Sequence, residues 1–294
     1  MSKNNGSSPA YRIFSITVLI ILALLFLFPL YWIITGALKT PAAINAPSPQ
    51  WIPEELTLRN FQLLFSKRSA PLFQFGSTVG PTVPGAVRWL LNAVFMAVMA
   101  MLLTCITASM AGYALAKKRF TGRFILFSLI VAAMALPKQV ILIPLIREMS
   151  SLGLYDNIWA VIFPTVGWPF GVFLMKQFAE GIPGEMLEAA RIDGAGEIMT
   201  FTNIVYPMIK PGVGALAIFT FINSWNDYFM QLIMLTSSSN LTISLGIATM
   251  QAENSTDYGL IMAGAALAAV PIIIVFLIFQ KYFTKGITMG AVKG

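Results

Sequence analysis

The stretch Glu188-Ala189-Ala190-Arg191-Ile192-Asp193-Gly194, closed by Tyr206-Pro207, is the part of this sequence that decides its fold. It lies in a charged segment, residues 176–210, between two largely apolar segments, residues 158–175 and 212–235. Charged side chains are costly inside a lipid bilayer, whereas long apolar segments are suited to span one. We therefore expect residues 176–210 to form a loop in water between two membrane-spanning helices.

The residues of this loop predict two short helices joined at a hinge. Pro183 suits the first turn of a helix, and Glu188 lies near the positive N-terminal end of that helix. Gly194 is predicted to end it, because the residue after a C-cap often needs a positive φ angle. A second amphipathic helix follows before the chain returns to the membrane. The small side chains of Ala189 and Ala190 let the first helix enter a groove in another protein, which predicts a docking element.

The same loop carries a resemblance to a known family. The pattern Glu-Ala-Ala, three residues, Gly, nine residues, Ile, one residue, Leu-Pro resembles the signature loop of permease subunits of bacterial ABC importers. The matching residues here are Glu188, Ala189, Ala190, Gly194, Ile204 and Pro207, and Tyr206 replaces the usual Leu. Residues 111–116, 225–228 and 290–294 resemble the carbohydrate-uptake branch, in particular the smaller six-span permease of maltose-type systems.

The resemblance implies partners for this chain. It implies a second permease subunit, two ATPase subunits, one of which docks on the six matching loop residues, and an extracytoplasmic solute-binding protein. ATP and magnesium would bind to the ATPase and not to this chain. The cytoplasmic tail is residues 281–294, and its last part, residues 286–294, looks like the tail that reaches between the two ATPase subunits as an extended strand, with Gly290, Lys293 and Gly294 as contact residues. The implied location is the bacterial cytoplasmic membrane.

The composition excludes several other classes of protein. Hydrophobic residues make up 57% and charged residues 11% of the chain, whereas about a quarter of the residues in a soluble domain are charged. The net charge of +7 comes from basic residues near the ends of apolar segments, which indicates topological anchors and not nucleic-acid binding. The chain has no histidine, one cysteine and no phosphate-binding Gly-rich loop. We therefore expect no catalytic residues, metal site or bound cofactor.

The apolar segments predict an all-α membrane protein with six spans and both termini in the cytoplasm. The N-terminus is residues 1–12, and the membrane domain is residues 13–280. The spans are predicted at 13–38, 89–116, 124–146, 158–175, 212–235 and 258–280. Residues 40–88 form an external loop with one short helix near 56–65, and residues 236–257 form another external loop. The third span is expected to break at Pro137-Lys138.

Polar residues in the fifth span are candidates for substrate contact. Asn223, Asn226 and Asp227 share one helical face by their spacing, and Trp225 and Tyr228 add aromatic rings. Amides beside aromatic rings suit the hydroxyls and faces of sugars. The alternative is that all five residues only end the helix at the outer membrane interface.

Two function classes compete with an importer subunit. A membrane-embedded enzyme lacks a histidine and a second intramembrane carboxylate. A secondary transporter that works alone leaves the signature loop unexplained and lacks an evident inverted repeat. Within the importer hypothesis, Lys138 keeps acidic oligosaccharides and glycerol phosphate open as alternatives to a neutral sugar.

Overall fold

A computed structural model describes residues 9–75, 78–253 and 257–291 of the chain. Five helical segments in this part are long and apolar enough to cross a membrane, and a helix pair bent by 100° makes a sixth candidate span. The prediction of six spans is thereby confirmed. The candidates are Pro9–Ala37, Gly85–Lys117, the pair Arg123–Ala133 with Lys138–Ser151, Trp159–Glu180, Glu197–Asn226 and Tyr258–Gln280.

Helix α4 (Gly85–Lys117) is the central element of the bundle. It packs against α7 (Trp159–Val166), α8 (Pro169–Glu180) and α11 (Tyr206–Asn226), and Trp89, Met96 and Phe221 are fully buried in this core. Small residues allow the close approach. A Cβ atom on Gly112 would lie 2.6 Å from the backbone nitrogen of Lys176 in α8, so only glycine fits at this crossing.

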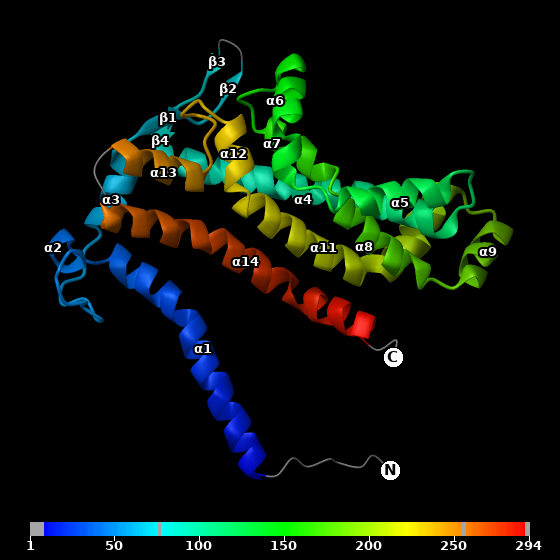
Figure 1. Ribbon diagram of the computed structural model, residues 1–294, viewed down its shortest axis with the longest axis horizontal. Helices are drawn as coiled ribbons and strands as arrows, with labels where there is room; N and C mark the ends of the chain where they lie inside the picture. The colour runs from blue at the N-terminus through cyan, green and yellow to red at the C-terminus, as the bar shows by residue number, and fades with distance from the viewer. Residues whose placement is uncertain (1–8, 76–77, 254–256, 292–294) are drawn as a thin grey trace.

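Two long helices flank this core. Helix α14 (Tyr258–Ala291) packs on α11 and also contacts α1 (Pro9–Ala37). Figure 1 shows α1 leaning away from the bundle toward its N-terminal end. The large apolar side chains along α1 are exposed, for example Phe26 and Leu24. This surface is suited to membrane lipid, because lipid tails accept apolar side chains without cost.

Three of the spans contain a break or end at one. Helix α5 (Arg123–Ala133) ends before Pro137 and is followed by the short helix η1 (Lys138–Ile141) and by α6 (Leu142–Ser151). The fourth span breaks between α7 and α8 at Gly167-Trp168. The fifth breaks at Asp227, which separates α11 from α12 (Tyr228–Met234). The predicted break at Pro137 is confirmed. The fifth span was predicted at residues 212–235, but its helix ends at Asn226, in agreement with the alternative that the polar residues end the helix.

The segment between α1 and α4 is more structured than the sequence predicted. The expected short helix is α3 (Arg59–Ser66), preceded by α2 (Pro41–Ile44). Two antiparallel strand pairs were not predicted: β1 (Ser69–Pro71) with β4 (Thr82–Pro84), and β2 (Gln74–Phe75) with β3 (Thr78–Val79). The side-chain amide of Asn60 donates to the carbonyls of Ala37 and Lys39, each at 2.9 Å, and so ties α3 to the end of α1.

Three other boundaries differ from the predictions. Residues 236–257 contain α13 (Ile243–Glu253), whose apolar residues Ile243 and Leu245 are buried in the core instead of lying in an external loop. Between α8 and α11 the chain forms α9 (Gly184–Ile192), α10 (Glu197–Thr200) and the π-helical turn η2 (Phe201–Val205), which continues into α11. The connecting loop is therefore shorter than residues 176–210. The tail is helical as far as Ala291 and not an extended strand.

Candidate functional site

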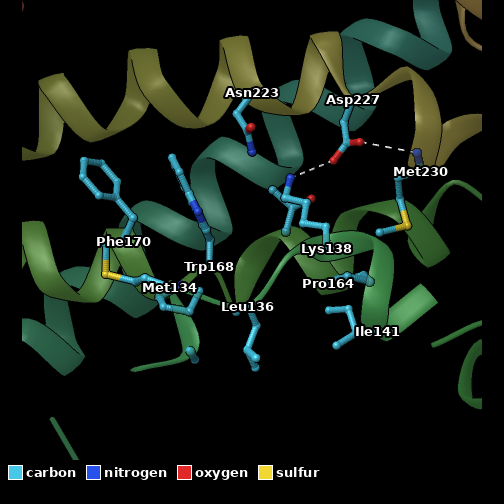
Figure 2. A pocket seen from close by; sticks show the side chains of 14 residues that line it. Met134, Leu136, Lys138, Ile141, Pro164, Trp168, Phe170, Asn223, Asp227 and Met230 are labelled. Carbon is cyan, nitrogen blue, oxygen red and sulfur yellow. Dashed lines mark hydrogen bonds and ion pairs between the residues drawn. The ribbon is translucent and has the colours of Figure 1, made fainter. Parts of the chain in front are cut away.

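The three broken spans meet at one cavity of about 470 Å³ (Figure 2). It is lined by residues next to each break: Ala133, Met134, Leu136, Lys138, Ile141, Pro164, Thr165, Gly167, Trp168, Pro169, Phe170, Asn223, Asp227 and Met230. Irregular backbone at membrane depth is tolerated only where it is buried in protein or lines a cavity. The breaks and the cavity therefore form one structural feature.

An ion pair crosses the cavity from one break to another. Lys138 Nζ lies 2.9 Å from Asp227 Oδ2, and these side chains are 47% and 15% exposed, respectively. The other carboxylate oxygen of Asp227 accepts a hydrogen bond from the backbone N–H of Met230 at 3.3 Å. Asp227 thus caps the N-terminus of α12 and holds Lys138 at the same time. The lysine joins the η1 segment to the α11–α12 break.

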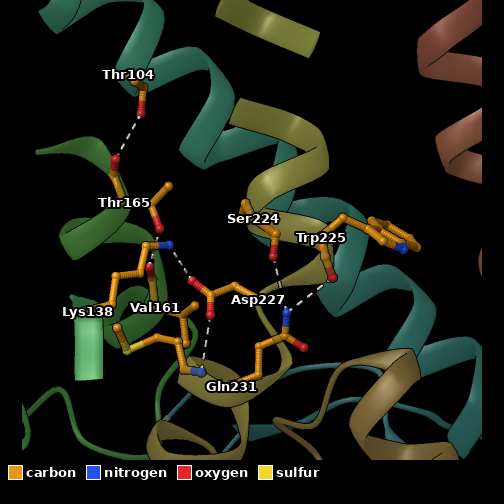
Figure 3. Close-up of polar contacts among 9 residues, drawn as sticks. Thr104, Lys138, Val161, Thr165, Ser224, Trp225, Asp227 and Gln231 are labelled. Atoms are coloured by element: carbon orange, nitrogen blue, oxygen red, sulfur yellow. Dashed lines mark hydrogen bonds and ion pairs between the residues drawn. The ribbon is translucent and has the colours of Figure 1, made fainter. Parts of the chain in front are cut away.

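A buried glutamine donates hydrogen bonds to backbone carbonyls at this same break (Figure 3). Gln231 Nε2 donates to the carbonyls of Ser224 at 3.2 Å and Trp225 at 3.4 Å in the last turn of α11, and the carbonyl of Ser224 also accepts from the backbone N–H of Asp227 at 3.5 Å. Its Oε1 accepts a hydrogen bond from the hydroxyl of Thr242. Sequence reasoning missed Gln231, although a polar side chain four residues after Asp227 in an apolar segment was a usable signal.

The five predicted substrate residues do not lie together. Asn223 and Asp227 line the cavity, but Trp225 is only 4% exposed and stacks on Phe221 in the core, with ring centroids 5.6 Å apart. Asn226 and Tyr228 are exposed and are not among the lining residues. The structure therefore places two of the five at the cavity, buries Trp225 in the core, and leaves Asn226 and Tyr228 on the surface.

The aromatic rings at the cavity come from the fourth span. Trp168 and Phe170 flank the start of α8, and their ring centroids are 5.0 Å apart. Their position follows from the Gly167-Trp168-Pro169 break, which turns both rings toward the cavity (Figure 2). Neither ring was among the substrate residues predicted from the sequence.

A second ordered feature is the segment around α9, which Figure 1 places at one end of the long axis. Leu187 and Ala190 are buried against the protein's own core, whereas Glu188 and Ala189 are exposed. Ile192 is 86% exposed. The helix therefore presents a mixed surface of one carboxylate and apolar groups to the outside. Ala190 does not belong to that surface, which corrects the prediction that both alanines enter a partner's groove.

Gly194 ends α9 as predicted. Its φ is +77°, its N–H donates to Arg191 O at 3.1 Å, and the N–H of Ala195 donates to Ala190 O at 2.9 Å. These two bonds are those of a Schellman motif, in which glycine is favoured because it adopts positive φ without strain. The direction of the chain after α9 is thereby set by backbone hydrogen bonds.

Two lysines at the end of α4 hold this segment in place. Lys117 Nζ donates to the carbonyls of Glu180 at 3.0 Å and Ile182 at 2.6 Å, near the end of α8. Lys118 forms an ion pair with Glu197 at the start of α10. The rings of Tyr113 and Phe201 lie 5.8 Å apart and join α4 to the π-helical turn. The α9 segment is therefore attached to the central helix on both sides.

The remaining predicted contact residues have different surroundings. Ile204 is partly buried, packed against the cluster that contains Val205 and Leu216, and Pro207 is exposed in the first turn of α11. Gly290 lies in the last part of α14, and Lys293 and Gly294 lie outside the described residues. In the part of the chain that the structure describes, no group of three His, Cys, Asp or Glu residues could hold a metal ion.

The chain has broken membrane helices around a cavity and an ordered loop at one end of the bundle. These features are typical of multi-pass membrane permeases. The family model that matches residues 106–289 is described as a binding-protein-dependent transport system inner membrane component. The chain belongs to this family of inner-membrane permeases of ABC importers.

Several relatives match nearly the whole chain. It is 32% identical to the arabinooligosaccharides transport system permease protein AraQ of Bacillus subtilis (strain 168), over 100% of both chains. It is 28% identical to the trehalose/maltose transport system permease protein MalG of Thermococcus litoralis, over 96% of this chain and 97% of that one.

One solved structure supports the fold. The chain matches, with a TM-score of 0.73 and 23% identity, a chain in the crystal structure of a bacterial ABC transporter involved in the import of the acidic polysaccharide alginate. The match covers 94% of this chain and 99% of that chain. At this identity the likeness concerns the fold alone.

Proposed function

We propose that this chain is one of two permease subunits of an ATP-driven importer and forms half of the passage for a sugar or oligosaccharide. The observation that carries the proposal is the cavity where three helix breaks meet. It offers the rings of Trp168 and Phe170 beside the amide of Asn223 and the Lys138–Asp227 pair. Aromatic faces next to hydrogen-bonding groups suit a polyhydroxyl solute.

The names of the relatives support the same class of solute. Arabinooligosaccharides and trehalose or maltose are named for the two relatives above. Lys138 is the specific observation that favours an anionic solute such as glycerol phosphate as the alternative. Its pairing with Asp227 argues against that alternative.

We infer that α9 is the docking element for the ATPase subunit. Its exposed residues Glu188, Ala189 and Ile192 offer one carboxylate and apolar surface, and the Schellman motif and the two lysines of α4 fix the helix relative to the bundle. A rigidly attached helix can transmit the motion of a partner to the spans that surround the cavity. Pro207 lies where this segment enters α11, and Gly290, Lys293 and Gly294 remain candidates for a second contact.

The other partners follow from this arrangement. ATP and magnesium would bind to two cytoplasmic ATPase subunits, a second permease would complete the passage, and a solute-binding protein would deliver the sugar from outside. Both termini of the chain would lie in the cytoplasm, on the same side as α9. The basic residues Lys117, Lys118 and Arg123 flank the turn between α4 and α5 on that side, as the distribution of positive charge in membrane proteins favours.

A direct test is to tag this chain in its native host, purify it from membranes, and identify the proteins that accompany it. We expect a second permease and an ATPase whose hydrolysis rises when the binding protein and an oligosaccharide are added to proteoliposomes. Uptake of radiolabelled arabinotriose, maltotriose, glycerol 3-phosphate and alanine then identifies the solute class. Uptake of only glycerol phosphate or alanine, or transport by the chain alone without an ATPase, would overturn the proposal.

A further inference from the structure

The two charged residues at the cavity form an ion pair with each other, so their formal charges cancel. Of its lining residues, all within the described part of the chain, only Lys138 and Asp227 are charged at neutral pH, and they lie 2.9 Å apart. The lining therefore has no net formal charge. A lysine at this position without a partner would be an attractive site for a carboxylate or a phosphate. With Asp227 beside it, that attraction is offset.

The two members of the pair are held in different ways. The Asp227 carboxylate is 15% exposed and anchored on the backbone N–H of Met230, so its position is set by the helix break. Lys138 is 47% exposed and sits on η1, directly after Pro137. An ammonium group has three donors, of which the pair with Asp227 uses one. The remaining donors can reach the hydroxyl oxygens of a solute in the cavity.

We propose that the Lys138–Asp227 pair is the charge filter of this passage: Lys138 donates hydrogen bonds to neutral sugars, and Asp227 neutralises it so that acidic sugars are disfavoured. The inference rests on the proposed function, because it assumes that a solute passes through this cavity. Trp168, Phe170 and Asn223 give the same neutral character to the rest of the lining. Asp227 acts through Lys138 and is a positioning residue, whereas Lys138 contacts the solute.

Three variants separate charge from structure. Asp227→Asn keeps an oxygen to cap Met230 but leaves Lys138 unpaired, so the cavity gains one positive charge. Lys138→Met leaves Asp227 unpaired, so the cavity gains one negative charge. The double variant Lys138→Met with Asp227→Asn is neutral again. Glu148→Gln is the matched control, since it removes one carboxylate from an exposed position on α6 that does not line the cavity.

The measurement is binding of maltotriose and trigalacturonate, two trisaccharides that differ in charge, to the purified transporter without its binding protein. Quenching of tryptophan fluorescence reports binding, because Trp168 lies at the cavity. We expect the wild type and the Glu148→Gln variant to prefer maltotriose. Asp227→Asn is expected to shift the ratio of the two affinities at least tenfold toward trigalacturonate, and the double variant to restore the preference for maltotriose.

The outcomes distinguish the two proposals. If the wild type binds maltotriose but Asp227→Asn leaves the affinity ratio unchanged, the charge filter is wrong and the proposed function stands. A wild type that prefers trigalacturonate also overturns the filter. If the wild type binds neither sugar, the cavity is not a sugar site and both proposals fail. The amount of each variant in the membrane, and the ATPase that co-purifies with it, show whether the variant has folded.

Discussion

Lys118 and Glu197 form an ion pair that joins the end of α4 to the start of α10, across 79 positions of sequence. The ammonium of Lys118 also lies over the ring of Tyr113, 5.2 Å from its centroid. Since α4 is the central helix of the bundle, this contact connects the proposed docking segment to the core. The ion pair therefore connects the surface on which the ATPase would dock to the membrane spans that would move during transport.

We expect Lys118→Ala to uncouple ATP hydrolysis from uptake more than it lowers stability. Glu197 is 67% exposed, and water screens such a pair, so its loss costs less than about 1 kcal/mol. Without the bridge, however, the start of α10 is no longer held to α4. The measurement is uptake per ATP hydrolysed in proteoliposomes. Arg119→Ala, a neighbouring exposed basic residue, is the control, and equal coupling in both variants would contradict the prediction.

A substitution at Gly194 is expected to weaken ATPase binding through the backbone. No atom lies within 4 Å of a Cβ placed there, so a side chain meets no obstacle, but the φ of +77° disfavours a β-branched residue. We expect Gly194→Val to cost about 1–2 kcal/mol and to displace α9. The amount of ATPase that co-purifies with the chain reports the effect.

Gly196 provides the matched control for this prediction. It lies two residues further along the same loop, has equally open surroundings, and has a φ of −67° that any residue adopts. Gly196→Val should therefore retain the ATPase. If both variants retain it, the Schellman motif at Gly194 does not set the docking geometry.

The structure of the α9 segment was predictable because its sequence signals are local. The end of α9 depends on Gly194 and on hydrogen bonds between near neighbours, and the break of the third span depends on Pro137. The lining of the cavity depends instead on how each helix is rotated about its axis. Helix α11 is apolar on most sides, so its sequence does not show that Trp225 faces the core while Asn223 faces the cavity.

Asp156 links the loop between α6 and α7 to the loop between α12 and α13. Its φ is +56°, and its carboxylate accepts hydrogen bonds from the backbone N–H groups of Thr236 at 2.8 Å and Ser237 at 2.9 Å. Burial raises the pKa of Asp156, but the hydrogen bonds from Ser237, Thr236 and Asn240 outweigh it and hold the pKa below its usual value. The folded state therefore favours the charged carboxylate.

Acid is expected to destabilise the protein through this residue. A carboxylate with a depressed folded-state pKa stabilises the fold above its unfolded pKa of about 4, and this stabilisation is lost as the pH falls through the folded pKa. Asp156→Asn tolerates the positive φ but removes the charge, at a cost of about 1 kcal/mol near neutral pH. Thermal unfolding of both proteins from pH 7 to pH 3 checks this, and the difference between them should shrink at the acidic end. A difference that stays constant with pH would contradict the assignment.

The break between α11 and α12 is expected to depend on Gln231. This side chain is fully buried and donates to the carbonyls of Ser224 and Trp225 in the last turn of α11, where helix carbonyls lack i+4 partners. Gln231→Leu keeps the volume but leaves both carbonyls and the hydroxyl of Thr242 without this partner, which costs about 1–3 kcal/mol. The double variant Gln231→Leu with Thr242→Val also removes the hydroxyl that would have no partner, and should recover part of the lost stability. Thermal unfolding in detergent measures the stability of both variants. Since Asp227 sits at the same break, Gln231→Leu should also weaken maltotriose binding, and unchanged stability and binding would show that the break does not need the glutamine.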